Sequence, residues 1–385
     1  MKRVLAVCAA LCALAAVSRP AGAAGVVVPM QLIDNRPFVP VTVNGRRFDF
    51  VVDTGGDYAI STQVAAELGL HPSPAASVGG ANATSVAAGD VVVARLAVGS
   101  ITVRDVHVSV IDFTPLVTHI GFRRFDGIIG YTFLRSHAVT FDARRGMLTF
   151  DAPPSAQDAS HAISFRLWQN LLVVRAGVDG TEGDFILDTG DRSAITLFTP
   201  FAREHYRSRG SGTLRDVVTG FGLAAPIVAD VTRLHSLALA GYDVADPIAR
   251  LATQQAGGFA SDEVAGSIGN AVLSRFTATF DYPRGVLRLS DPVDAPRLEW
   301  DRSGMWLSRA GANLRIDGVI AGGPAAEAGL QDGDLVVEVD GAAAVGVDLP
   351  ALRERLTRTQ TSGVRVEIRR GQLERSALVH LRTLV

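Results

Sequence analysis

The strongest constraint on the fold of this 385-residue chain is an internal repeat. Residues 49–55 read Asp-Phe-Val-Val-Asp-Thr-Gly, and residues 184–190 read Asp-Phe-Ile-Leu-Asp-Thr-Gly, at an offset of 188 − 53 = 135 positions. Residues 141–146 and 280–285 form a second matched pair, each with Phe-Asp at its start and Arg-Gly at its end, at an offset of 280 − 141 = 139 positions. The chain is therefore expected to contain two copies of one structural unit.

Each copy is predicted to consist mostly of β-strands. Asn44-Gly45 and Asp179-Gly180 are favoured two-residue hairpin turns. Residues 50–52 and 185–187 are short, fully apolar runs, which are typical of strands buried on both faces. The sequence therefore predicts a mainly-β fold built from two duplicated lobes.

Changes in composition divide the chain into parts. The Pro-Pro pair at residues 153–154 is typical of a linker between the two copies, and a second break falls near Pro296. The expected parts are residues 1–24 as a signal peptide, residues 25–153 as lobe 1, residues 154–296 as lobe 2 and residues 297–385 as a separate C-terminal domain.

The first residues have the pattern of an export signal. Lys2 and Arg3 precede an apolar run over residues 4–17, and small residues that suit a cleavage site follow it. The alternative is an uncleaved membrane anchor, but the run is shorter than the ~20 residues that a spanning helix needs. Cys8 and Cys12 are the only cysteines of the sequence, and both lie in this segment. We therefore expect a soluble periplasmic or secreted protein, with no stable membrane insertion after cleavage of the signal.

An Asp-Thr-Gly turn follows the buried strand of each copy. If the copies pack around a pseudo-twofold axis, the carboxyl groups of Asp53 and Asp188 meet. Two adjacent carboxyl groups cannot both ionise easily, so they share one proton. The unprotonated member can take a proton from water while the protonated member donates to a carbonyl oxygen, which is general acid–base chemistry for amide hydrolysis. Such a tripeptide is expected roughly 0.1 times by chance in a chain of this length, so two at matched positions are strong evidence.

These turns resemble the active-site turns of retropepsin-like aspartic peptidases. The resemblance covers about residues 30–290 and implies a bilobal β fold with a cleft between the lobes and Asp53 and Asp188 as the catalytic pair. It implies that four neighbouring residues support this pair: Thr54, Gly55, Thr189 and Gly190. In this family an apolar-apolar-Gly motif packs beneath each turn, which residues 128–130 match well and residues 267–269 match loosely.

The same resemblance implies that a β-hairpin flap from each lobe closes the cleft. The expected flap residues are Gly79 and Gly80 in lobe 1 and Gly220 and Gly222 in lobe 2. The alternative is that both segments are ordinary surface loops.

Two positions depart from the pattern of the family, which usually has Ala, Ser or Thr directly after Asp-Thr-Gly. Gly56 occupies this position in lobe 1 and removes a hydroxyl donor to the carboxylate. Asp191 occupies it in lobe 2, where a third carboxylate near the pair favours an acidic pH optimum. Alternatively, Asp191 turns away and pairs with Arg192.

Residues 322–330 read Gly-Gly-Pro-Ala-Ala-Glu-Ala-Gly-Leu and are followed by Gly333-Asp334, an order that resembles a bacterial PDZ domain. The resemblance implies that an extended peptide adds a strand at a sheet edge and that its C-terminal carboxylate meets the N–H groups of a loop. That loop is expected at four residues: Gly304, Met305, Trp306 and Leu307. The alternative is that the domain only packs on the lobes.

Other functions find little support in the sequence. The formal net charge is −2 and no block of like charge occurs, so no nucleic acid partner is expected. The histidines have no spacing typical of a zinc site, and no Gly-x-Ser-x-Gly segment occurs, so we expect neither a metal nor another cofactor.

Together these observations predict an exported aspartic endopeptidase, expected as a monomer, that hydrolyses protein or peptide substrates. Its PDZ domain is expected to recruit substrates or regulate cleavage and to take a peptide C-terminus as its ligand. The rival interpretation is a catalytically silent peptide-binding protein of the cell envelope, and Gly56 and Asp191 are the features that keep it open.

Overall fold

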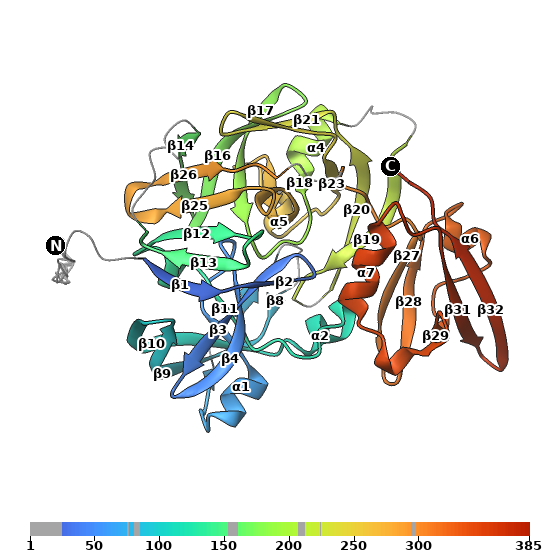
Figure 1. The fold of residues 1–385 in the computed structure, drawn as a ribbon, viewed down its shortest axis with the longest axis horizontal. Helices are drawn as coiled ribbons and strands as arrows, with labels where there is room; N and C mark the ends of the chain where they lie inside the picture. The colour runs from blue at the N-terminus through green and yellow to red at the C-terminus, as the bar shows by residue number, and fades with distance from the viewer. Residues whose placement is uncertain are drawn as a thin grey trace, which may run out of the picture.

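The computed structural model describes residues 25–74, 77–80, 85–152, 161–206, 212–223, 225–293 and 297–385. Strands far outnumber helices in these residues, which confirms the expected mainly-β fold. Two β lobes lie side by side, and the C-terminal domain packs at one side of them (Figure 1). None of the helices that the structure describes is long and apolar enough to span a membrane. The predicted signal peptide and the predicted boundaries near residues 153 and 296 lie outside the described residues.

Lobe 1 is built on one strongly curved sheet. Its strands are β2 (Gln31–Ile33), β3 (Arg36–Val43), β4 (Arg46–Val52), β5 (Ala59–Ser61), β6 (Ser73–Pro74), β9 (Ala88–Val98), β10 (Ile101–Ile111) and β11 (Gly127–Ile129). The other elements are the hairpin strands β7 (Val78–Gly79) and β8 (Ser85–Val86) and the helices α1 (Thr62–Glu67), α2 (Thr114–Ile120) and α3 (Tyr131–Leu134). The strand order is β2-β3-β4-β11-β5-β10-β9-β6, and an additional pairing of β3 with β9 brings the sheet round into a barrel-like shape.

Lobe 2 repeats this plan. Its strands are β15 (Arg166–Trp168), β16 (Leu171–Val178), β17 (Thr181–Asp188), β18 (Ile195–Leu197), β19 (Leu214–Phe221), β20 (Pro226–Arg233), β21 (Ser236–Leu239), β22 (Tyr242–Ala245), β23 (Ile248–Ala252) and β24 (Gly266–Gly269). Its helices are α4 (Thr199–His205), η2 (Gly258–Ala260) and α5 (Asn270–Leu273). The strand order is β19-β20-β23-β18-β24-β17-β16-β21-β22, with β15 beside β16.

The predicted hairpin turns join the strands that lead to the two Asp-Thr-Gly segments. Asn44 and Gly45 link β3 to β4, and both have positive φ angles, 49° and 86°. Asp179 and Gly180 link β16 to β17 with φ angles of 48° and 79°. Two successive positive φ angles are the signature of the turn type whose twist suits a tight hairpin.

A sheet shared by both lobes relates the two copies. Its strands are β1 (Val26–Pro29), β12 (Ala138–Asp142), β13 (Met147–Phe150), β14 (Ala162–Ser164), β25 (Thr277–Asp281) and β26 (Val286–Ser290), in the order β1-β13-β12-β25-β26-β14, with η3 (Tyr282–Arg284) between the last two in sequence. At its centre Thr140 pairs with Thr279, and their hydroxyl oxygens are 2.9 Å apart. Because these residues are matched by the offset of 139, the axis relating the copies passes through this pair.

The C-terminal domain has its own core, in which Leu314, Ile316 and Val336 are fully buried. Its elements are β27 (Met305–Ala310), β28 (Asn313–Val319), α6 (Pro324–Glu327), β29 (Leu335–Val339), β30 (Ala342–Ala343), η4 (Ala344–Gly346), α7 (Leu349–Thr357), β31 (Gly363–Arg370) and β32 (Leu373–His380). The strand order is β27-β28-β29-β31-β32, with β30 beside β29, so β27 lies at an edge. Figure 1 shows this domain next to β19 of lobe 2, with α2 of lobe 1 beside α7.

Candidate active site

Each aspartate of the predicted pair lies at the end of a buried strand. Asp53 follows β4, and its N–H donates to the carbonyl of Ile129 in β11 at 2.9 Å. Asp188 is the last residue of β17 and pairs with Gly269 of β24. Both partner strands run parallel to the strand that carries the aspartate. The two predicted apolar-Gly motifs, which contain Ile129 and Gly269, therefore lie next to the turns.

The two turns pack so closely that each aspartate side chain lies over the glycine of the opposite turn. A Cβ atom on Gly55 would lie 2.6 Å from Cγ of Asp188, and one on Gly190 would lie 2.5 Å from Oδ2 of Asp53. Real Cβ atoms do not approach other heavy atoms this closely, so only glycine fits at both positions. The carboxyl groups of Asp53 and Asp188, hereafter the Asp pair, therefore both lie where the two turns meet, and each affects the pKa of the other.

Thr54 and Thr189 lock the turns together. Oγ1 of Thr54 donates to the carbonyl of Leu187 at 2.7 Å, and Oγ1 of Thr189 donates to the carbonyl of Val52 at 2.7 Å. In return, each Oγ1 accepts the N–H of the other threonine at 3.1 Å. Both side chains are buried, so water cannot replace these hydrogen bonds, and the arrangement holds the Asp pair in register.

Burial and charge make the two members of the Asp pair unequal. The pKa of Asp188 is raised well above its ordinary value, first by burial and then by the negative charges of Asp53 and Asp191. Burial also raises the pKa of Asp53, but the N–H of Gly55, 2.8 Å from its Oδ1, and the positive charge of Arg36 oppose this rise. Burial and the neighbouring charges therefore raise the pKa of both groups, and the two titrate as a unit.

Asp191 has a partner that the sequence does not predict. Its carboxylate is ion-paired with Arg250 and accepts hydrogen bonds from the N–H and the hydroxyl of Ser193, at 3.0 and 2.9 Å. Of the two alternatives left open by the sequence, the pairing with Arg192 is not found, because the side chain of Arg192 lies 3.0 Å from Asp34 instead. Burial raises the pKa of Asp191, but the charge of Arg250 and the hydrogen bonds from Ser193 outweigh it, and the net shift is downward. Asp191 is therefore an ionised neighbour of the Asp pair.

The acidic residues around the turns do not form a metal site. Within the described ranges, no group of three or more His, Cys, Asp or Glu side chains is arranged to hold a metal ion. The carboxyl groups of the Asp pair are themselves able to accept and donate protons.

Arg36 is a residue near the Asp pair that the sequence analysis does not identify. It lies on β3, and its Nε donates to the carbonyl of Gly190 at 2.9 Å. Its Nη1 pairs with the buried Asp34 at 2.5 Å, and Asp34 also pairs with Arg192. The turn between β2 and β3 of lobe 1 thus holds the active-site turn of lobe 2. The repeat carries no signal for this contact, because an offset of 135 places the apolar Leu171 at the matching position.

The predicted flap segment of lobe 1 forms a hairpin. Gly79 ends β7, which pairs with β8, and Gly80 follows it. The carbonyl of Gly80 accepts the N–H of Gly258 in lobe 2 at 3.5 Å, so this hairpin reaches across to the other lobe. The tip at residues 81–84 lies outside the described residues.

The predicted flap segment of lobe 2 is also a hairpin. Gly220 lies in β19, which pairs with β20, and Gly222 lies in the turn between them. The N–H of Gly222 donates to the carbonyl of Ala225 at 2.9 Å. Both segments are therefore hairpins rather than irregular loops, while their action as flaps stays a prediction.

The predicted peptide-binding loop of the C-terminal domain lies at the start of β27. The N–H of Gly304 donates to the carboxylate of Asp301 at 3.0 Å, and the N–H of Met305 lies 3.3 Å from the hydroxyl oxygen of Ser303. The side chains of Met305, Trp306 and Leu307 are all buried. Helix α2 of lobe 1 packs against β27, so the domain packs on the lobes in this structure, while peptide binding by the loop stays a prediction.

Two interlocked Asp-Thr-Gly turns in paired β lobes, followed by a separate small domain, define an aspartyl-protease-like protein. Residues 39–133 match the family model of the aspartyl proteases, and residues 315–370 match that of the PDZ domain. Among solved structures, the chain is similar to an aspartic proteinase from Irpex lacteus, with 15% identity, a TM-score of 0.44, and coverage of 70% of this chain and 98% of that one. A comparison with curated protein sequences finds no match.

Proposed function

We propose that this protein is an aspartic endopeptidase in which the Asp pair activates a water molecule. The observation that carries the proposal is the packing of the two Asp-Thr-Gly turns, in which each aspartate side chain lies against the glycine of the opposite turn and the interlocked threonines hold both turns. A pair in which one member keeps a proton while the other ionises supplies both the acid and the base that amide hydrolysis needs.

In the proposed reaction, Asp53 is ionised and Asp188 is protonated when the peptide binds. Asp53 takes a proton from water as the water oxygen attacks the carbonyl carbon, and Asp188 gives its proton to the carbonyl oxygen. The result is a neutral gem-diol, and the two carboxyl groups have exchanged protonation states. Asp53 then protonates the leaving nitrogen, Asp188 takes a proton from a gem-diol hydroxyl, and the C–N bond breaks without a covalent enzyme intermediate.

We further propose that the protein acts as a monomer outside the cytoplasm, in the periplasm or as a secreted protein, on unfolded or extended protein segments. The basic start and the apolar run of residues 4–17 support export. The PDZ domain supports a role in recruiting or regulating, because such domains bind extended peptides at a sheet edge.

The surroundings of the Asp pair favour this proposal over the silent peptide-binding protein. Asp191 supports the silent peptide-binding interpretation less than its sequence position suggests, because the ion pair with Arg250 balances its negative charge. Gly56 provides no hydroxyl, but the N–H of Gly55 already donates to Asp53. A Cβ atom on Gly56 would also lie 2.9 Å from Oδ2 of Asp53, so glycine gives this carboxylate its room.

The proposal is tested by incubating the purified protein with a mixed peptide library from acid to neutral pH and identifying new termini by mass spectrometry. Asp53→Asn and Asp188→Asn are each expected to lower the cleavage rate by at least ~10²-fold. The control is Asp49→Asn, at an exposed aspartate on β4, the strand that precedes Asp53; this variant should cleave normally. Undiminished cleavage by Asp53→Asn or by Asp188→Asn would contradict the proposed role of the Asp pair. Tight peptide binding without cleavage at any pH would favour the rival interpretation, a catalytically silent peptide-binding protein.

A further inference from the structure

The edge strand of the PDZ domain is covered by lobe 1. Among the described strands only β28 pairs with β27, so the other side of β27 is the edge where a peptide could add. Helix α2 of lobe 1 packs against β27 (Figure 1). Trp306 and Ser308 of β27 do not belong to the core of the PDZ domain, yet they are only 9% and 0% exposed. The space between β27 and α7, hereafter the PDZ groove, is therefore occupied.

Arg353 of α7 holds the end of α2 in the PDZ groove. Its guanidinium donates to the carbonyls of His119, at 2.7 Å, and Ile120, which end α2. The same group donates to the carbonyl of Leu307 in β27 at 2.7 Å. Although burial lowers the pKa of Arg353 to about 10, the group stays charged at neutral pH, and a cation at a helix C-terminus is favourable. Arg353 therefore links α7 and β27, which form the two walls of the PDZ groove, to the end of α2, which occupies the groove.

Gly121 allows this close approach. It is the C-cap of α2 with a φ angle of 82°, and a Cβ atom there would lie 2.6 Å from Cδ2 and 2.7 Å from Cβ of Leu349 in α7. His119, two residues before Gly121, adds a second contact with the PDZ domain, because its Nδ1 lies 3.2 Å from Oδ2 of Asp317 in β28. The end of α2 therefore fits the PDZ domain through its main chain as well as through side chains.

The same helix packs under both flap hairpins. Leu116 and Ile120 of α2 belong to an apolar cluster with Val51, two residues before Asp53. Partly buried members of this cluster come from the hairpin of lobe 1, as Val78, and from the hairpin of lobe 2, as Leu223. A shift of α2 would therefore change the packing of both hairpins and of the strand that leads to the Asp pair.

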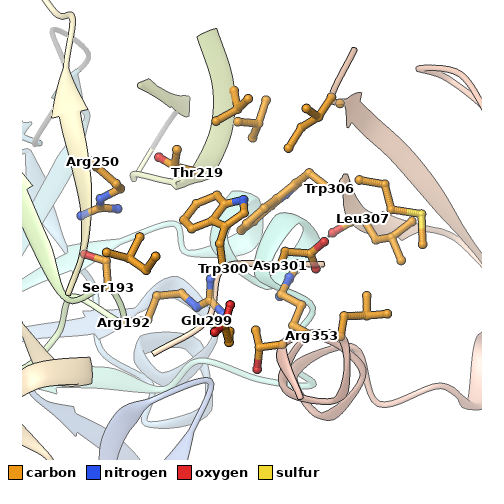
Figure 2. Close-up of a pocket in the computed structure, with 18 of the residues that line it drawn as sticks. Arg192, Ser193, Thr219, Arg250, Glu299, Trp300, Asp301, Trp306, Leu307 and Arg353 are labelled. Atoms are coloured by element: carbon orange, nitrogen blue, oxygen red, sulfur yellow. Dashed lines mark hydrogen bonds between the residues drawn. The ribbon is translucent and has the colours of Figure 1, made fainter. Parts of the chain in front are cut away.

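The PDZ groove is not completely filled. A cavity of about 410 Å³ lies at its loop end, between the PDZ domain and lobe 2. Figure 2 shows Trp306 and Arg353 at this cavity with Trp300 beside Trp306. A pocket of this size between two domains has the dimensions of a ligand site, so part of the groove stays open beside α2.

We propose that α2 is the resident ligand of the PDZ groove and that an extended peptide pairing with β27 must displace it. The two occupants exclude each other because α2 packs against the edge of β27 with which a peptide would pair. The guanidinium of Arg353 also lies at this edge, where it donates to the carbonyl of Leu307. Displacement of α2 loosens the apolar cluster under the flap hairpins, so a peptide on the PDZ domain lowers the order of the cleft. This inference rests on the proposed peptide binding by the PDZ domain and names its regulation.

The test uses a matched pair of glycine variants in the full chain. Gly121→Ala and Gly69→Ala both place alanine at a left-handed position after a helix of lobe 1, with φ angles of 82° and 65°. Only the alanine at 121 meets the PDZ domain, at Leu349, since a Cβ atom at 69 has no neighbour within 4 Å. Both are made with Asp188→Asn, so that no probe is cleaved and the result does not depend on the proposed peptidase activity.

The first measurement is fluorescence anisotropy with a pool of labelled, extended peptides that carry free C-terminal carboxylates. Gly121→Ala is expected to bind at least about tenfold more tightly than Gly69→Ala or the parent, because α2 no longer competes fully for the groove. Equal affinity in all three proteins would overturn the proposal that α2 competes for the PDZ groove, but it would leave peptide binding intact. Absence of peptide binding to Gly121→Ala would overturn both the proposed competition by α2 and the proposed peptide binding by the PDZ domain.

The second measurement is amide hydrogen exchange of the parent with and without saturating peptide. The expected result is faster exchange in residues 114–121 and in the hairpin that contains Gly220, with slower exchange in β27. A bound peptide that leaves the exchange of residues 114–121 unchanged would show that α2 stays in place, and would overturn the proposal.

Discussion

Asp191 and Arg250 form a buried ion pair directly beyond the second active-site turn. Arg250 is only 3% exposed, and its Nε also donates to the hydroxyl of Thr196 at 2.9 Å, so its position is fixed. The negative charge of Asp191 nevertheless acts on Asp188 and raises its pKa. A third carboxylate therefore tunes the Asp pair without sharing its proton.

Removal of this ion pair should move the basic limb of the pH–activity profile to lower pH. The double variant Asp191→Asn with Arg250→Met removes one of the two negative charges that raise the pKa of Asp188, so Asp188 loses its proton at lower pH, although burial and the charge of Asp53 remain. Both residues are replaced because a lone buried arginine would cost about 3–5 kcal/mol. The measurement is kcat/KM against pH.

The control for this shift is the more exposed pair Arg215 and Asp230, with 2.8 Å between the charged groups. The double variant Arg215→Met with Asp230→Asn should keep the basic limb of the parent. A basic limb that stays in place or rises in the Asp191 and Arg250 variant would contradict the assignment of Asp188 as the proton holder.

The stability of the protein relative to Asp188→Asn should fall as pH rises. The ordinary pKa of the Asp188 carboxyl group is 3.8, and its pKa in the folded protein lies well above this. A raised folded pKa contributes stability that is complete below 3.8 and is lost as pH rises through the folded pKa, because the unfolded chain releases the proton first. Asparagine does not titrate, so the variant lacks this contribution. Urea unfolding of both proteins at several pH values measures the difference, and a difference that is constant with pH would refute the expectation.

Thr54→Val should destabilise the protein much more than Thr54→Ser. Valine leaves the buried carbonyl of Leu187 without a donor and the N–H of Thr189 without an acceptor, at a cost of about 1–3 kcal/mol for each group. Serine keeps the hydroxyl and loses only a methyl group, at a cost of about 1 kcal/mol. Urea unfolding provides the measurement, and equal stability of the two variants would show that the threonine hydrogen bonds do not hold the turns.

Gly56→Ala should lower kcat roughly tenfold, because the new Cβ atom would lie 2.9 Å from Oδ2 of Asp53 and push this carboxylate out of line. KM should change little, since the substrate-binding surface is not altered. Gly346→Ala is the matched control, because a Cβ atom there has no neighbour within 4 Å. An unchanged kcat in Gly56→Ala would mean that Asp53 tolerates displacement.

The repeat alone was sufficient to predict two β lobes and the meeting of Asp53 with Asp188. Matched strands in the same order impose matched folds, and the antiparallel pairing of Thr140 with Thr279 joins residues at the second offset, 139 positions. The hairpin turn at Asn44-Gly45 was equally predictable, since a two-residue turn depends on local φ angles. Local geometry and repetition are properties that a sequence carries directly.

Contacts between segments far apart in the chain were decided only by the tertiary structure. Asp191 pairs with Arg250 rather than with its neighbour Arg192, because the parallel pairing of β18 with β23 brings residue 250 beside the turn. Arg353 binds the end of α2, although 233 positions separate it from Ile120. Such partners depend on which faces pack together, and no local pattern records that choice. The sequence thus determined the lobes and the Asp pair, whereas packing decided which charges tune that pair and what occupies the PDZ groove.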